Sequence, residues 1–179
     1  MNIKEFFEQS AGKWFVQRTS YTLDEQKAAS SKSEIVFEFL QSDDTQVTKL
    51  CEQLRVKSDT VWGGAKISWD NSVDWGKDKQ VGFNILVPVP DVDNPNQGRL
   101  LRLAQNQPTT GIAIRYEMGE DDALVFIAES EHTYSEERLW FASSNLRLRS
   151  CLEKHAGGYQ NVAFYSEIKR IENKEEGKS

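Results

Sequence analysis

The chain has 179 residues and a net charge of −6, a length that favours one domain with a real core. Hydrophobic residues make up 38% and charged residues 28%, as in ordinary globular proteins. The acidic balance, without a Lys/Arg-rich stripe, argues against a nucleic-acid binder, and no apolar run approaches the roughly 18 residues that span a bilayer. The first ten residues are too polar for a signal peptide, so we expect a cytoplasmic or stromal protein that does not enter a membrane.

Two short helices are predicted. The first spans residues 2–10, where Asn2 is a suitable N-cap. The second spans residues 43–55 and has apolar residues at helical spacing, namely Val47, Leu50, Cys51 and Leu54.

The rest of the chain is typical of short antiparallel strands, with period-2 alternation and hairpin-length links. Strands are predicted at Lys13–Thr22, Ser33–Leu40, Gly64–Asp70, Lys79–Val87, Arg99–Leu103, Ile112–Met118, Ala123–Ser130, Thr133–Phe141, Asn145–Leu152 and Val162–Ile171. About ten such strands favour an all-β, lipocalin-like or fatty-acid-binding-protein-like up-and-down barrel, which encloses room for one small ligand. We expect residues 1–171 to form this single domain and the charged tail, 172–179, to be disordered.

The last predicted hairpin carries the most informative charges. Arg147 and Arg149 share one face of their strand, roughly 6–7 Å apart, and Glu136 lies in the preceding strand. Two guanidinium groups beside a carboxylate suit a ligand that has two carboxylates and a group to protonate. Alternating arginines are also common on the solvated face of a sheet, and this segment alone leaves both interpretations open.

Cysteine and histidine are scarce. Cys51 and Cys151 lack the spacing of metal ligands, and only His132 and His155 could complete a site. We therefore expect two free thiols and no metal centre, while a Cys–His nucleophile stays open.

Several motifs over residues 1 to about 171 together resemble the S-type phycobiliprotein chromophore lyases. They are MxIxEFFExSAGKWxxQRT at the N-terminus, GGAxxSW at Gly63–Trp69, Asp74-Trp75, and ERLWFASxNLRLRS at Glu137–Ser150. The resemblance implies a lipocalin-like barrel that binds a linear tetrapyrrole (bilin) as substrate, with no further cofactor. It implies thioether attachment of phycocyanobilin or phycoerythrobilin to a cysteine of an apo-phycobiliprotein subunit, in the cyanobacterial cytoplasm or the plastid stroma. It also implies a homodimer, or a heterodimer with a paralogue.

Each property of a bilin finds candidate residues in this chain. Arg147 and Arg149 are candidates for the two propionates, and Arg18 for a third positive contact, although Arg18 would equally pack over the Trp14 indole. Because Arg147 and Arg149 share a face, we expect that replacing both with Gln abolishes bilin binding and leaves folding intact.

The remaining candidates are aromatic and acidic. Trp69 and Trp75 are suited to stack on pyrrole rings. Glu136 is the candidate catalytic residue, which would hydrogen-bond the pyrrole nitrogens and keep the bilin protonated and electrophilic. Glu137 takes this role if the strand register is shifted by one residue, and Asp70 and Asp74 are lesser candidates.

Two other functions stay open at this point. A plain carrier of a carboxylated hydrophobic ligand would share the barrel and an arginine pair, but it needs neither the two tryptophans nor Glu136. A non-catalytic partner subunit of a heterodimeric lyase would share nearly everything. A bilin reductase is disfavoured because the chain lacks alternating helices and strands.

Overall fold

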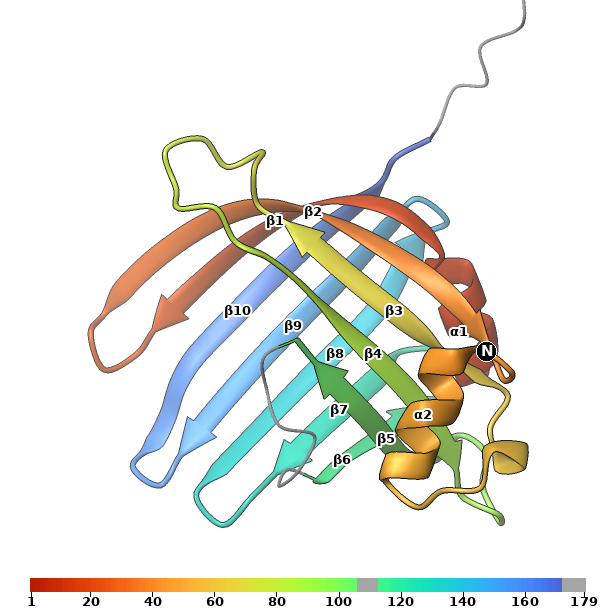
Figure 1. Ribbon diagram of the computed structural model, residues 1–179. Coiled ribbons are helices and arrows are strands. Elements are labelled where there is room, and N and C mark those ends of the chain that lie inside the picture. Colours follow the sequence, from red (N-terminus) through yellow and green to blue (C-terminus); the bar gives the residue numbers. More distant parts are fainter. Residues whose placement is uncertain (106–112, 172–179) are drawn as a thin grey trace, which may run out of the picture.

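Ten antiparallel strands close into one barrel in the computed structural model, which describes residues 1–105 and 113–171 (Figure 1). Around the barrel the order is β1-β10-β9-β8-β7-β6-β5-β4-β3-β2. The elements are α1 (Ile3–Ser10), β1 (Gly12–Thr22), β2 (Lys27–Gln41), α2 (Thr45–Gln53), the 3₁₀ turn η1 (Ser58–Thr60), β3 (Gly63–Asp70), β4 (Val81–Pro90), β5 (Gln97–Ala104), β6 (Ala113–Met118), β7 (Leu124–Glu129), β8 (Thr133–Ser143), β9 (Leu146–His155) and β10 (Gly158–Lys169). The predicted all-β, up-and-down barrel with two short helices is confirmed.

The boundaries differ from the prediction where strand residues are polar or are prolines. β2 begins at Lys27, six residues before the predicted start, because residues 27–32 pair with β1 without an apolar alternation to mark them. β4 continues to Pro90 through residues that read as a loop. Ile112, the predicted start of the sixth strand, and the predicted disordered tail at 172–179 lie outside the described residues.

Helix α1 closes one end of the barrel. Asn2 and Glu5 form a complete capping box, in which each side chain accepts a hydrogen bond from the other's backbone N–H at 2.9 Å. The helix buries Phe6 and Phe7 in the main core. Just after it, Trp14 is fully buried and its indole N–H donates to the carbonyl of Ser10 at 2.8 Å. The barrel interior therefore has an aromatic floor at this end.

Helix α2 covers the outside of the sheet, where its apolar side packs on residues of β4 and β5. This second core joins Val47, Leu50 and Cys51 of the helix to Ile85, Val87 and Leu101 of the strands. Since these residues face outward, their neighbours Asn84, Leu86, Leu100 and Arg102 face the barrel interior. In the described part of the chain, no helix is long and apolar enough to cross a membrane.

The opposite end of the barrel carries the hairpins that join β1 to β2, β7 to β8 and β9 to β10 (Figure 1). Because α1 closes one end of the barrel, the end that carries the hairpins is its mouth. Any ligand that enters the interior meets the aromatic floor at α1 and the polar residues of the strands along the walls.

Candidate functional site

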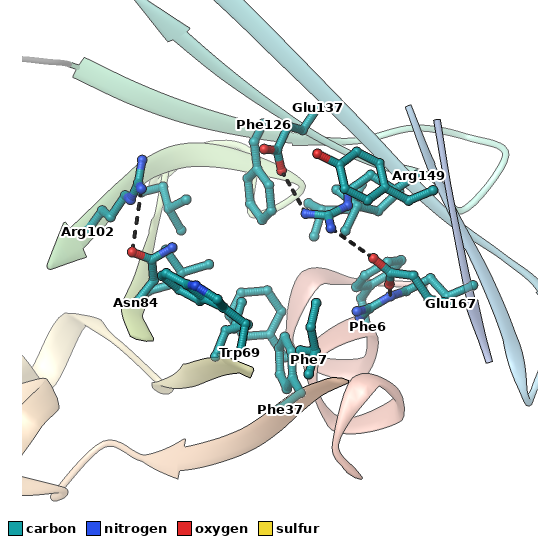
Figure 2. A pocket seen from close by; sticks show the side chains of 18 of the residues that line it. Phe6, Phe7, Phe37, Trp69, Asn84, Arg102, Phe126, Glu137, Arg149 and Glu167 are labelled. Carbon is teal, nitrogen blue, oxygen red and sulfur yellow. Dashed lines mark hydrogen bonds and ion pairs between the residues drawn. The ribbon is translucent and has the colours of Figure 1, made fainter. Parts of the chain in front are cut away.

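A cavity of about 420 Å³ lies inside the barrel, within the range of roughly 300–1,000 Å³ usual for small-molecule sites. Phe6, Phe7 and Phe37 form its floor, and Trp69, Phe126 and Tyr165 line its walls. Figure 2 shows the labelled Phe and Trp rings around an open centre, with Glu137, Arg149 and Glu167 at one side and Arg102 across from them. The cavity thus combines apolar contact area with a few placed polar groups.

The deepest polar group is a buried ion pair between Arg147 of β9 and Glu167 of β10. Arg147 Nε donates to Glu167 Oε2 at 2.5 Å, and its Nη1 donates to Ser10 Oγ at 2.7 Å. Its guanidinium carbon lies 4.8 Å from the centroid of the Trp14 ring. Burial lowers the pKa of Arg147, and the carboxylate of Glu167 opposes this shift. Arg147 therefore joins α1 to the barrel wall as a structural group, although it also borders the cavity.

Nearer the mouth, Arg149 lies between two carboxylates and an aromatic ring. Its Nη2 is 3.1 Å from Glu167 Oε1 and its Nη1 is 3.6 Å from Glu137 Oε2. The guanidinium stacks on Tyr165, with 3.8 Å from Cζ to the ring centroid. Desolvation lowers the pKa of Arg149, but the two carboxylates outweigh this and raise it.

Two buried polar atoms in this cluster have no hydrogen-bond partner among the described residues. They are Arg149 Nε and Glu167 Oε1; the ion pair between Arg149 and Glu167 does not have hydrogen-bond geometry. Buried donors are nearly always satisfied, so a free donor beside a cavity favours a ligand oxygen there.

Arg18 of β1 covers the other side of Tyr165. Its guanidinium lies 5.7 Å from the ring centroid, and within the described residues it has no carboxylate within 4.0 Å. Register explains the arrangement, because Arg18 pairs with Tyr165 and Tyr165 pairs with Arg149 across three adjacent strands. The ring therefore lies between two guanidinium groups. Trp14 is contacted by Arg147 and Lys169, and Arg18 contacts Tyr165 in place of the predicted Trp14.

Trp69 of β3 lies in the cavity wall, as the stacking hypothesis requires. Its ring lies over Gly82 of the neighbouring strand β4. A Cβ built on Gly82 would be 2.3 Å from Trp69 Cζ2, so only glycine leaves room for this position of the ring.

The cavity carries two more positive groups than negative ones. Its charged lining residues are Arg18, Arg102, Arg147, Arg149, Glu137 and Glu167. The sequence reasoning missed Arg102, Asn84 and Glu167. In β5 both Leu100 and Leu101 are apolar, so alternation could not tell which face of that strand turns inward.

The predicted grouping of Glu136 with the two arginines is corrected by the barrel. Glu137 pairs with Cys151 and Leu139 with Arg149, so the odd-numbered residues of β8 face the cavity. Glu136 lies on the outer surface, where the hydroxyl of Tyr134 donates to its Oε2 at 2.6 Å. This hydrogen bond raises the pKa of Tyr134 to about 12. The β8 carboxylate beside Arg149 is thus that of Glu137.

Trp75 lies outside the cavity, with 92% of its surface exposed, in the connection from β3 to β4. In the same connection, Asp74 accepts a hydrogen bond from the backbone N–H of Lys32 at 3.0 Å, which ties this connection to β2. Asp70 accepts from Ser72, which lowers its pKa. Neither aspartate lines the cavity, and the binding role predicted for Trp75 stays a prediction.

The two thiols are free and occupy different surroundings. Cys51 is on the buried side of α2, against β4 and β5, and burial raises its pKa. Cys151 pairs with Glu137 near the mouth; burial, together with Glu137 and Glu153, raises its pKa to about 12. Over residues 1–105 and 113–171, no group of His, Cys, Asp or Glu side chains is arranged to hold a metal ion.

The closed barrel and its charged interior define a small-molecule-binding protein of the lipocalin-like type. Residues 2–170 match the family model described as CpeS-like protein, and the chain belongs to this family. It is 44% identical over 171 residues to the chromophore lyase CpcS/CpeS of Thermosynechococcus vestitus, covering 94% of this chain and 93% of that protein.

Other relatives cover the chain almost completely. The chromophore lyase CpcS/CpeS 1 of Trichodesmium erythraeum is 42% identical over 174 residues, with 97% and 100% of the two chains covered. A phycocyanobilin lyase subunit, CpcS, of Picosynechococcus is 34% identical over 166 residues, with 92% and 84% covered. The solved structure of the S-type phycobiliprotein lyase CPES of Guillardia theta has the same fold, with a TM-score of 0.81 at 24% identity over 97% of this chain and 95% of that one.

Proposed function

We propose that this chain is a phycobiliprotein chromophore lyase. It binds a free linear tetrapyrrole, phycocyanobilin or phycoerythrobilin, in the barrel and catalyses its attachment to a cysteine of a phycobiliprotein subunit through a thioether. Relatives at 44% and 34% identity are named chromophore lyase and phycocyanobilin lyase subunit. The observation that carries the proposal is the cavity itself, with its aromatic lining and two surplus positive charges.

The cavity suits a long conjugated ligand with two carboxylates. Phe6, Phe7 and Trp69 offer flat apolar contacts. Arg149 and Arg18 offer charge-assisted hydrogen bonds, and the unpartnered Nε of Arg149 is a donor that a propionate satisfies. Arg147, whose hydrogen bonds go to Glu167 and Ser10, supports Arg149 indirectly by holding Glu167.

We assign the acidic role to Glu137 in place of Glu136, because Glu137 lines the cavity and is 3.6 Å from Arg149. Its carboxylate accepts hydrogen bonds from the pyrrole N–H groups and so stabilises the protonated, cationic chromophore. The acceptor's thiolate adds to the ethylidene carbon of ring A and the chromophore takes up one proton. The sum is addition of S–H across a double bond, with no oxidant or reductant.

The lyase supplies position and electrostatics, and the acceptor supplies the nucleophile. Cys151 is the thiol nearest the cavity, and its raised pKa keeps it protonated and therefore a poor nucleophile. The acceptor cysteine approaches through the mouth, at the hairpin end of the barrel.

The oligomeric state and the cellular location that we propose follow from membership of the family. The chain acts as a homodimer, or with a paralogous partner subunit, as the name of the Picosynechococcus relative supports. Its curated relatives come from cyanobacteria, which supports the cyanobacterial cytoplasm, or a plastid stroma, as the place of the reaction.

Reconstitution tests the proposal. The purified chain is mixed with phycocyanobilin or phycoerythrobilin, then with an apo-phycobiliprotein subunit, and a denaturing gel is examined for zinc-enhanced bilin fluorescence. We expect a fluorescent acceptor band that requires this chain. Bilin binding without a covalent acceptor, even with a paralogous subunit added, would indicate a carrier and refute the lyase function.

A further inference from the structure

We infer that Arg102 and Asn84 form a second carboxylate-binding element, on the cavity wall opposite Arg149, so that the two propionates of the bilin are held on opposing walls. This inference rests on the proposed function. It assigns a binding role to a wall of the cavity whose residues, Arg102 and Asn84, lie outside the sequence motifs.

The barrel order separates the two elements. Arg102 is on β5, which lies four strands from β9 in one direction and four from β1 in the other. Arg149 and Arg18, on those two strands, therefore share one wall, and Arg102 faces them across the cavity. Figure 2 shows Arg102 and Asn84 on one side of the open centre, and Arg149 with Glu167 on the other.

The partners of the cavity arginines differ in a way that suits a dianion. Arg147 and Arg149 are paired with carboxylates of the protein. Within the described residues, Arg18 and Arg102 have no carboxylate within 4.0 Å. Because these two account for the surplus positive charge, and because they lie on opposite walls, each is available to one carboxylate of the ligand.

Asn84 positions Arg102 without neutralising it. Arg102 Nη2 is 3.4 Å from Asn84 Oδ1, a long contact with a neutral amide, and charge-assisted bonds to a carboxylate are shorter and about twice as strong. Asn84 lies on β4 beside the register pair Leu86–Arg102, so both side chains reach the cavity from adjacent strands. A propionate entering there replaces a weak contact with a strong one.

Holding both carboxylates fixes the orientation of the chromophore. One propionate on one wall would leave the ligand free to pivot about that contact. Two propionates on opposing walls fix the two central rings across the barrel, and the terminal rings then have defined positions relative to the mouth. Such an orientation is what the acceptor cysteine requires in order to meet ring A.

The test compares phycocyanobilin with its dimethyl ester in absorbance titrations of three variants. Arg102→Gln removes the proposed contact. Arg99→Gln is the matched control, because Arg99 is on the same strand but lies outside the cavity lining. Asn84→Asp keeps the arginine and gives it a carboxylate partner of its own, which competes with the ligand.

We expect Arg102→Gln and Asn84→Asp to raise the Kd for the diacid about tenfold, whereas Arg99→Gln leaves it unchanged. For the dimethyl ester, the wild type and Arg102→Gln should differ by less than about twofold. Wild-type affinity for the diacid in Arg102→Gln would overturn the inference, and so would equal losses for diacid and ester, which would indicate a packing role. In either case binding and transfer by the wild type leave the proposed function intact; no binding by the wild type would defeat both.

Discussion

Replacing Arg147 with Gln should destabilise the fold more than it weakens ligand binding. Arg147 is 3% exposed and Glu167 is fully buried, and breaking such a pair costs roughly 3–5 kcal/mol. Glu167 keeps Arg149 as a partner, so the lower end applies. The lost contact with Trp14, at 4.8 Å, adds about 0.5–1 kcal/mol. The sum is about 3.5–4 kcal/mol, or a fall in Tm of roughly 10 °C for a protein of this size.

Thermal unfolding followed by tryptophan fluorescence measures this effect. Arg138→Gln is the control, because it removes an equal charge from an exposed ion pair with Asp121 and should cost less than about 1 kcal/mol. The double variant Arg147→Met with Glu167→Leu should recover part of the loss, since it removes both charges of the buried pair and Arg149 keeps Glu137 as a partner. A Tm for Arg147→Gln within about 2 °C of the wild type would refute the reasoning.

The remaining predictions concern the mouth and the walls of the cavity. Burial and nearby carboxylates raise the pKa of Cys151 to about 12, so its thiol stays neutral at pH 8.5. The free energy of unfolding that depends on this neutral thiol is fully present below the ordinary pKa of a cysteine, and it is lost as the pH rises towards 12. Mass spectrometry should find Cys151 alkylated by iodoacetamide only after unfolding, and rapid labelling of the folded chain would contradict the burial. Trp69→Ala should weaken bilin binding about tenfold by absorbance titration. Trp75→Ala, at a site 92% exposed, tests the binding role predicted for that residue: we expect weaker bilin binding at an unchanged Tm, and unchanged affinity would exclude Trp75 from the site. Glu137→Gln should blue-shift bound bilin and slow its transfer to the acceptor, whereas Glu136→Gln should not, and the opposite result would return the acidic role to Glu136.

Local chemistry made the elements predictable. The capping box of Asn2 and Glu5, the apolar spacing of α2 and the strand alternation each depend on neighbours a few residues apart. The barrel followed from the number and spacing of the strands. β2 was predicted too short because its first residues are held by pairing with β1, which no local pattern reports.

Which face of a strand turns inward can be decided only from its pairing with the neighbouring strands. In β8 both faces carry charged residues, with Glu137 on one and Glu136 and Arg138 on the other. Only the pairing of Leu139 with Arg149 decides that Glu137 faces inward. A shift of one residue exchanges the faces completely, so the sequence left two candidates where the barrel admits one.

The position of each arginine along the barrel axis also could not be predicted from the sequence. Arg147 and Arg149 share a face, as predicted, but Arg147 reaches Ser10 of α1 while Arg149 stacks on Tyr165 nearer the mouth. Arg147 and Arg149 are therefore only two residues apart, yet Arg147 is structural and Arg149 is available to a ligand. Arg102 was missed because adjacent leucines hide the inward face of β5.

A crystal structure of the chain with phycocyanobilin would test the central claim most directly. We expect the chromophore in the cavity, against Trp69, with one propionate at Arg149 and Arg18 and its terminal ring at the mouth. The outer surface offers another hollow, lined by Tyr134, Glu136, Leu152 and His155 among others. A bilin bound in that hollow, with the barrel interior empty, would contradict the cavity as the substrate site.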